Sequence, residues 1–227
     1  DKIFFVQMAD APILAMDVLE WSRHFRCFPG QGEFDLPGFL APIIQSGYTG
    51  PLSLEIFNDG FRASPNGATA KDGYRSLLWL EEQTRRVLGQ TDADLFETAL
   101  LPTFNGTEFI EFAASPAEAK KLSTMLEGMG FSLAGMHRSK QVALWCNGGA
   151  RVVINYQPHS WADHFYQRQG VSLCAMALRV SESAPIIARA KAYGYATWQG
   201  DAGPNESAIP AVCAPDGSLV YLVDESQ

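Results

Sequence analysis

Residues 1–89 alternate between apolar runs and amphipathic stretches. The runs "KIFFVQMAD" (residues 2–10) and "PLSLEIF" (51–57) are almost continuously hydrophobic, which is typical of strands buried on both faces of a parallel sheet. Two stretches with helical spacing follow them, "DLPGFLAPIIQSGY" (35–48), with Asp35 as the expected N-cap, and "KDGYRSLLWLEEQTRRVLG" (71–89). A strand–helix–strand–helix order predicts parallel strands joined by right-handed crossovers.

After a linker at residues 90–104 the pattern changes, and an internal repeat begins. The run "GTEFIEFAA" predicts a strand, "SPAEAKKLSTMLEGMG" a helix capped by Ser115 and Glu118, and "FSLAGMHRS", "QVALWCNG" and "ARVVINYQ" three strands. The same order recurs about 65 residues later in "VSLCAMALRVS", "SAPIIARAKAYG", "YATWQGD", "AIPAVCAP" and "SLVYLVDE". We therefore predict an α/β part over residues 1–89 and an α+β part of two βαβββ modules over 105–227.

Composition and charge narrow the function classes. The net charge of −8 leaves no basic stripe for nucleic acid, and no apolar run is long enough to span a bilayer. The cysteines are scattered, which favours reduced thiols and a cytoplasmic protein. They are Cys27, Cys146, Cys174 and Cys213. The chain starts at Asp1, close to a strand, and we expect it to be an internal piece of a longer protein.

The repeat resembles the vicinal oxygen chelate superfamily, and most closely the N-terminal half of 4-hydroxyphenylpyruvate dioxygenase. The words that carry this resemblance are "FIEFAA", "VSLCAMALRV…IIARAKAYGY" and "APDGSLVYLVDE". In that superfamily the first and last strands of the modules supply His and Glu ligands to a metal. Here these strands lack histidine, and their nearest carboxylates, Glu108, Glu111 and Glu225, suit iron poorly. We therefore expect a metal-free, structural half-domain.

Three histidines in this part of the chain are considered as possible metal ligands. His159 and His164, in "PHSWADH", have a spacing that could chelate zinc or iron, although packing against neighbouring aromatic residues is the simpler reading. His137, in "GMHRSK", is predicted to be a turn residue.

Residues 1–89 resemble the last strand–helix units of a (β/α)8 TIM barrel of the xylose isomerase-like type. The matching words are "VQMAD", "FRCFPGQGEFDL" and "GYTGPLSLEIF". Barrel active sites lie where the strands end, and Gln7 and Glu55 stand near the ends of the two predicted strands. The resemblance implies that they hold a divalent metal (Mg²⁺, Mn²⁺ or Co²⁺). The simpler alternatives are that Gln7 is a polar residue whose hydrogen bonds are made within the protein, and that Glu55 pairs with an arginine.

The segment "RCFPGQGEFDL" lies between these two positions. Its "PGQG" resembles a phosphate cradle, but a tight turn that carries Arg26 over the pocket is the preferred reading. Arg26 would then hold a substrate carboxylate or hydroxyl through its planar fork. Ser22 is a further substrate-binding candidate, with Arg23 and His24 as alternatives from the same segment.

Together the two resemblances match the arrangement of the two-domain bacterial 3-dehydroshikimate dehydratases. The family implies a lyase that dehydrates 3-dehydroshikimate to protocatechuate in quinate/shikimate catabolism, with Gln7 and Glu55 as metal ligands and Arg26 on the substrate. Its remaining ligands and its base have no counterpart in this chain, so we expect the chain alone to be inactive. The alternatives are a sugar-phosphate isomerase or epimerase, a dioxygenase-like protein, and a non-catalytic assembly module that self-associates into a homo-oligomer.

Overall fold

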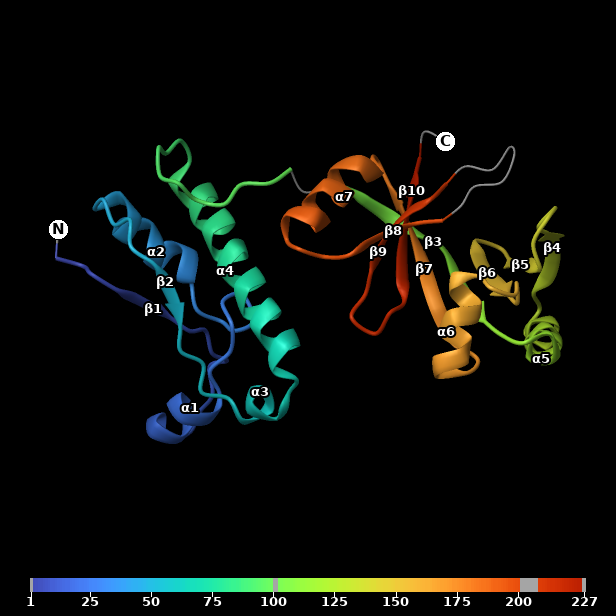
Figure 1. Cartoon of the computed structure of the whole chain (residues 1–227), viewed down its shortest axis with the longest axis horizontal. Helices are drawn as coiled ribbons and strands as arrows, with labels where there is room; N and C mark the ends of the chain where they lie inside the picture. Colours follow the sequence, from blue (N-terminus) through green and yellow to red (C-terminus); the bar gives the residue numbers. More distant parts are fainter. Residues whose placement is uncertain (1, 100–101, 201–207, 226–227) are drawn as a thin grey trace. The chain divides into compact units, whose positions relative to one another are not determined.

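The computed structural model describes residues 2–99, 102–200 and 208–225 (Figure 1). The chain divides into two compact units, Asp1–Thr98 (unit 1) and Ala99–Gln227 (unit 2). The division falls within the range 90–104 that the sequence analysis assigns to a linker.

Unit 1 contains the predicted strand–helix–strand–helix order. Its two strands pair in parallel, with Val6 opposite Leu52 and Met8 opposite Leu54. The strands are β1 (Val6–Met8) and β2 (Leu52–Leu54), and the helices are α1 (Val18–His24), α2 (Leu36–Gln45), α3 (Asp59–Ala63) and α4 (Asn66–Leu88). The short helices α1 and α3 were not expected from the sequence. The predicted Asp35 cap of α2 is confirmed, because Oδ1 of Asp35 accepts the Gly38 N–H.

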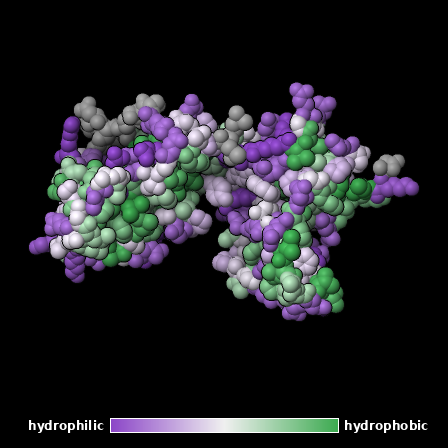
Figure 2. Space-filling model, turned by 180° about the vertical axis from the view of Figure 1, so that it is seen from behind, coloured by the Kyte–Doolittle hydropathy of each residue, from purple (hydrophilic) through white to green (hydrophobic). Residues whose placement is uncertain are grey.

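The core of unit 1 lies on one face of this small sheet. Val6 and Met8 of β1 pack with residues of α2 and α4, whereas Gln7 is exposed on the other face. The prediction that the first run is buried on both faces was therefore wrong. Ile3, Phe4 and Phe5 precede β1 and remain 45%, 86% and 54% exposed. In the described part of the chain no third strand joins β1 and β2 to shelter them, and Figure 2 shows hydrophobic surface on this unit.

Unit 2 contains both predicted βαβββ modules. The described strands form one eight-stranded sheet in the order β4-β5-β6-β3-β7-β10-β9-β8. The first module comprises β3 (Phe104–Ala113), α5 (Pro116–Gly128), β4 (Ser132–Met136), β5 (Val142–Asn147) and β6 (Ala150–Asn155). The second comprises β7 (Ser172–Val180), α7 (Ser183–Ala192), β8 (Thr197–Gln199), β9 (Pro210–Cys213) and β10 (Leu219–Asp224). The modules join where β3 pairs antiparallel with β7.

Helices cover different parts of this sheet. The cluster that contains Leu126 of α5 also contains Trp145 and Ile154 of its own module, and Ile186 of α7 packs with Val180 and Leu222. A further helix that was not predicted from the sequence lies between the two modules, namely α6 (Trp161–Gln169). Ala162 and Phe165 of α6 pack with Ala113 of β3 and Cys174 of β7. The described helices include none long and apolar enough to cross a membrane.

Candidate functional site

Gln7 and Glu55 come from the two paired strands of unit 1. Gln7 lies opposite Ser53 in the parallel register, and Glu55 follows β2 directly. The Glu55 N–H lies 3.5 Å from the carbonyl oxygen of Met8, which continues the ladder to this position. Because side chains two positions apart in a strand share a face, Gln7, Ser53 and Glu55 lie on the face opposite the hydrophobic core.

Arg26 pairs with Glu55. Its Nη1 lies 3.1 Å from Oε2 of Glu55 and donates to the carbonyl oxygen of the same residue at 3.1 Å. Its Nε donates to the carbonyl oxygen of Ser22 at 2.8 Å. The carboxylate of Glu55 is thus neutralised by an arginine, which is the alternative considered above, and the pairing brings two of the candidate residues into direct contact.

The rest of the Arg26 side chain is also held in place. The guanidinium carbon lies 4.7 Å from the centroid of the Phe57 ring, an arrangement that favours a cation–π contact. Nη2 of Arg26 and Oε1 of Glu55 make no hydrogen bond with the residues that the structure describes. One donor nitrogen and one carboxylate oxygen therefore remain open to a ligand.

The loop that contains "PGQG" is organised by a carboxylate of the chain itself. Asp10, which follows β1, is 1% exposed, and its two oxygens accept the N–H groups of Ala11, Gly30 and Phe34. The backbone of Asp10 also exchanges two hydrogen bonds with that of Cys27. These loop amides therefore bind an aspartate, which favours the tight-turn interpretation over the phosphate cradle.

Asp10 was not recognised as a site residue from the sequence, although its position just after the first strand was a usable signal. It also affects its neighbour: burial, with a smaller contribution from the charge of Asp10, raises the pKa of the Cys27 thiol to about 11. Cys27 is therefore a protonated, poorly nucleophilic thiol at neutral pH. All four cysteines are free, as predicted.

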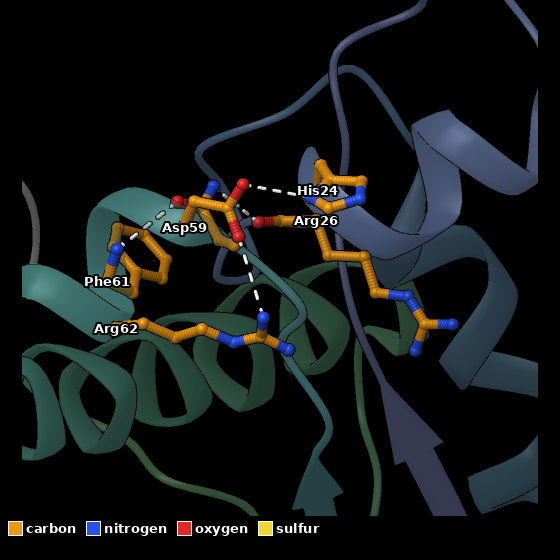
Figure 3. Close-up of polar contacts among 6 residues, drawn as sticks. His24, Arg26, Asp59, Phe61 and Arg62 are labelled. Atoms are coloured by element: carbon orange, nitrogen blue, oxygen red, sulfur yellow. Dashed lines mark hydrogen bonds and ion pairs between the residues drawn. The ribbon is translucent and has the colours of Figure 1, made fainter.

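A second polar pair lies beside Arg26 (Figure 3). Nδ1 of His24, in the last turn of α1, lies 2.9 Å from Oδ2 of Asp59, in the first turn of α3. Nη1 of Arg62 lies 3.5 Å from the other oxygen of Asp59. Asn58 caps α3 and donates its Nδ2 to the carbonyl oxygen of Arg26 at 2.9 Å. These contacts join the loop that carries Arg26 to the segment that follows Glu55.

Ser22 is half-buried in α1, where its hydroxyl donates to the carbonyl oxygen of Leu19 and its own carbonyl oxygen accepts Nε of Arg26. Ser22 therefore positions Arg26 through its backbone, and its role in binding substrate remains a prediction. Arg23 is exposed.

The candidate histidines of unit 2 occupy two different places, a turn and a cavity. Nδ1 of His137 accepts the N–H groups of Ser139 and Lys140, which confirms the predicted turn. His159 and His164 line a cavity of about 730 Å³ together with Trp161, Asp163, Gln167, Arg168 and Trp198. Among the residues that the structure describes, no three His, Cys, Asp or Glu side chains are grouped so as to hold a metal ion. The chelating interpretation of the histidine pair is not supported.

The carboxylates of unit 2 have partners within the sheet. Glu108 pairs with Arg151 and lies 3.5 Å from Nε of Arg179. Glu111 is 6% exposed and accepts Nδ2 of Asn155 at 2.7 Å. Burial raises the pKa of Glu111 above its usual range. These groups form structural contacts within the fold. Glu225 follows β10, and its N–H donates to the carbonyl oxygen of Val180.

Comparison with known proteins places unit 2 in a family. Residues 101–227, more than half of the chain, match the model described as hydroxyphenylpyruvate dioxygenase, N-terminal. The chain belongs to this family. Its eight-stranded sheet of two βαβββ modules is accordingly a vicinal oxygen chelate fold, as the sequence analysis expected.

Comparison with single relatives extends the similarity to unit 1. The chain is 56% identical over 230 residues to a 3-dehydroshikimate dehydratase from Pseudomonas putida and 55% identical over 229 residues to one from Pseudomonas aeruginosa. Each alignment covers 99% of this chain but 36% of the relative, so the chain spans about a third of their length. These matches confirm the resemblance to 3-dehydroshikimate dehydratases.

A solved structure supports the same relationship. It is described as a xylose isomerase-like TIM barrel/4-hydroxyphenylpyruvate dioxygenase fusion protein, and its aligned part is 55% identical in sequence to this chain. The alignment covers 99% of this chain and 37% of that protein, with a TM-score of 0.90.

Proposed function

We propose that this chain is part of a metal-dependent lyase that dehydrates 3-dehydroshikimate to protocatechuate. The identity of 56% to a 3-dehydroshikimate dehydratase over nearly the whole chain supports the reaction. The observation that carries the proposal for this chain is the shared face of β1 and β2, on which Gln7 and Glu55 lie with Arg26 against Glu55.

The shared face is also what a barrel interior requires. We propose that β1 with α2 and β2 with α4 are the last units of a (β/α)8 barrel, with Gln7, Ser53 and Glu55 on its inner surface. The helices cover the opposite face of the two strands, as in barrels of this class. Residues 1–89 would then be the end of the barrel, 90–104 the linker and 105–227 the structural domain.

The donor atoms on this face fit a hard divalent cation. An amide oxygen from Gln7 and a carboxylate oxygen from Glu55 are ligands that Mg²⁺, Mn²⁺ or Co²⁺ accepts. Two donors are too few for such an ion, so the remaining ligands would come from parts of the longer protein. When bound, a cation of this kind polarises a ketone oxygen and stabilises the negative charge that develops as the neighbouring C–H loses its proton.

The chain's own residues would bind and orient the substrate. Nη2 of Arg26 is directed by the contacts of Nε and Nη1 with Ser22 and Glu55, and it would hold the carboxylate of the cyclic acid. Because these contacts fix the guanidinium plane, the ring would be presented in one orientation.

Activity of the full-length protein that carries this chain tests the proposal. After treatment with a chelator and addition of Mg²⁺ or Mn²⁺, the protein is incubated with 3-dehydroshikimate, and formation of protocatechuate is followed by ultraviolet absorbance. Substituting Gln7→Ala or Glu55→Gln should lower kcat/KM by about 100-fold, in the range found for metal-site residues and their partners. Glu97→Gln is the matched control, because Glu97 forms a similar ion pair with Arg85 at 2.9 Å.

Two results would contradict the proposed reaction. Turnover that does not respond to chelation and metal would exclude the metal role of Gln7 and Glu55. Isomerisation or epimerisation of open-chain sugar phosphates, without protocatechuate from 3-dehydroshikimate, would favour the alternative barrel chemistry.

A further inference from the structure

The contact between His24 and Asp59 has the geometry of an acid–base pair. Oδ2 of Asp59 lies 2.9 Å from Nδ1 of His24, so a proton on Nδ1 points at the carboxylate. Nε2 of His24 has no hydrogen-bond partner among the described residues. A carboxylate on one ring nitrogen orients the imidazole and leaves the other nitrogen to exchange protons.

The backbone aligns this pair with the candidate substrate site. Phe25 and Asn58 form an isolated antiparallel bridge, so the residues on either side of each face their counterparts across it. His24 is opposite Asp59, and Arg26 is opposite Phe57, which the Arg26 guanidinium covers. His24 ends helix α1, and Arg26 follows with one residue between them, so the His24–Asp59 pair lies next to Arg26 at the start of the loop.

The exposure of these side chains is consistent with a site open to a small molecule. The side chain of His24 is 36% exposed, whereas that of Arg26 is 27% exposed. The charged groups around His24 are Asp59, with Arg62 on the other oxygen of Asp59, Arg23 next in sequence and Arg26. Asp59 is the anion in contact with the imidazole.

We propose that His24 is a catalytic acid of the dehydration, positioned by Asp59. This assignment rests on the proposed function, and it concerns the hydroxyl group that leaves rather than the proton next to the ketone. As the C–O bond to the ring breaks, its electron pair goes to the oxygen, which takes the proton from Nε2 of His24 and departs as water.

His24 also regains its proton within the same reaction. After the hydroxyl has left, the neutral Nε2 of His24 stands next to the carbon that carried it. It then accepts the proton lost from the adjacent ring CH₂ as the ring becomes aromatic, which restores the imidazolium. The proton first removed from the carbon next to the ketone ends on the former ketone oxygen as a phenol. One molecule of water is released, and no oxidant or reductant is needed.

Substitution of His24 in the full-length protein tests this role. His24→Ala should lower kcat for protocatechuate formation by about 100-fold, within the usual range for general acid–base groups, and change KM by less than about threefold. Added imidazole should restore part of kcat, because a diffusible acid can enter the space left by the ring. His164→Ala, which removes an exposed histidine of unit 2, is the control and should have no effect.

Isotope exchange separates the two proton steps. In D₂O the His24→Ala protein should still incorporate deuterium at the carbon next to the ketone of 3-dehydroshikimate while retaining the hydroxyl group. Asp59→Asn should lower kcat by about 10-fold, and the double variant should be no slower than His24→Ala, since Asp59 acts through His24.

The outcomes distinguish this assignment from the function on which it rests. An unsubstituted protein that forms no protocatechuate overturns both. If the unsubstituted protein dehydrates the substrate, then an unchanged kcat in His24→Ala, a loss that imidazole does not restore, or a simultaneous loss of deuterium exchange overturns the assignment of His24 alone.

Discussion

The carboxyl group of Glu111 is buried in the sheet of unit 2 with one amide donor, and its burial affects how stability depends on pH. Desolvation raises its pKa in the folded protein above the ordinary value of 4.5, and the hydrogen bond from Asn155 opposes this rise only in part. The folded state therefore binds this proton more tightly than the unfolded state does. Stability from this group is lost as the pH rises from the unfolded pKa through the folded one.

Replacing Glu111 by glutamine should remove this pH dependence. The amide keeps an oxygen for Nδ2 of Asn155 and carries no charge. Compared with the unsubstituted protein, we therefore expect Glu111→Gln to have a higher free energy of unfolding, with a larger difference at pH 7.5 than at pH 5. Urea unfolding at the two pH values measures the change. Glu118→Gln is a control of opposite sign, because hydrogen bonds from Tyr166 and Ser115 lower the pKa of Glu118. Equal responses of the two variants would contradict this account.

At the residue scale the sequence identified side chains better than it identified their contacts. Gln7 and Glu55 share a face because the positions of two apolar runs determine which side chains alternate with the core. The His24–Asp59 and Asp10–Gly30 contacts join residues far apart in the chain. No periodicity encodes such pairs, so the sequence could name His24 as an alternative but could not give its partner.

At the scale of single elements, helix α5 shows a sequence signal and its structural result together. Ser115 and Glu118 form the predicted capping box, in which the Ser115 hydroxyl accepts the Glu118 N–H and the Glu118 carboxylate accepts the Ser115 N–H. Pro116 occupies the first turn. The helix thereby satisfies donors that its own backbone leaves unpaired.

Loss of this cap should have a measurable effect on unit 2. Ser115→Ala is expected to lower the free energy of unfolding by about 1 kcal/mol, the usual value for an N-cap serine. Ser123→Ala, in the middle of the same helix, should be neutral or slightly stabilising, since alanine is the better helix former. Chemical denaturation compares the two variants. A cost at Ser123 as large as that at Ser115 would argue against the capping role.

The elements that the sequence missed share a physical cause. Helices α1, α3 and α6 are short, and a short helix forms only where tertiary packing and caps support it. Their N-caps are Asp17, Asn58 and Ser160, residue types that are equally common in turns. The two modules were predictable because each combines a helix with apolar residues at helical spacing, several strands and glycine at the turns.

At the scale of the whole molecule, each unit has core clusters built from its own residues. Leu80 of α4 is fully buried in the core of unit 1, and Ile154 of β6 is fully buried in a core of unit 2. We expect Leu80→Ala and Ile154→Ala each to cost about 3 kcal/mol, as for other buried aliphatic side chains.

Hydrogen exchange followed by peptide mass spectrometry can locate these effects. Protection should fall in unit 1 for Leu80→Ala and in unit 2 for Ile154→Ala. Val87→Ala is the control on the same helix as Leu80, because Val87 is 58% exposed and should have little effect. A uniform fall across both units in either core variant would contradict the assignment of separate cores.

The aspartate that follows β1 has a consequence for how a ligand would be received. Asp10 supplies, from within the fold, the negative charge that the amides of Gly30 and Phe34 attract. The loop is therefore ordered before any substrate arrives, and Arg26, which leads into it, is already in position beside Glu55. A ligand that meets a rigid recognition loop pays little entropy for ordering it, so most of its contact energy remains available for affinity and selectivity.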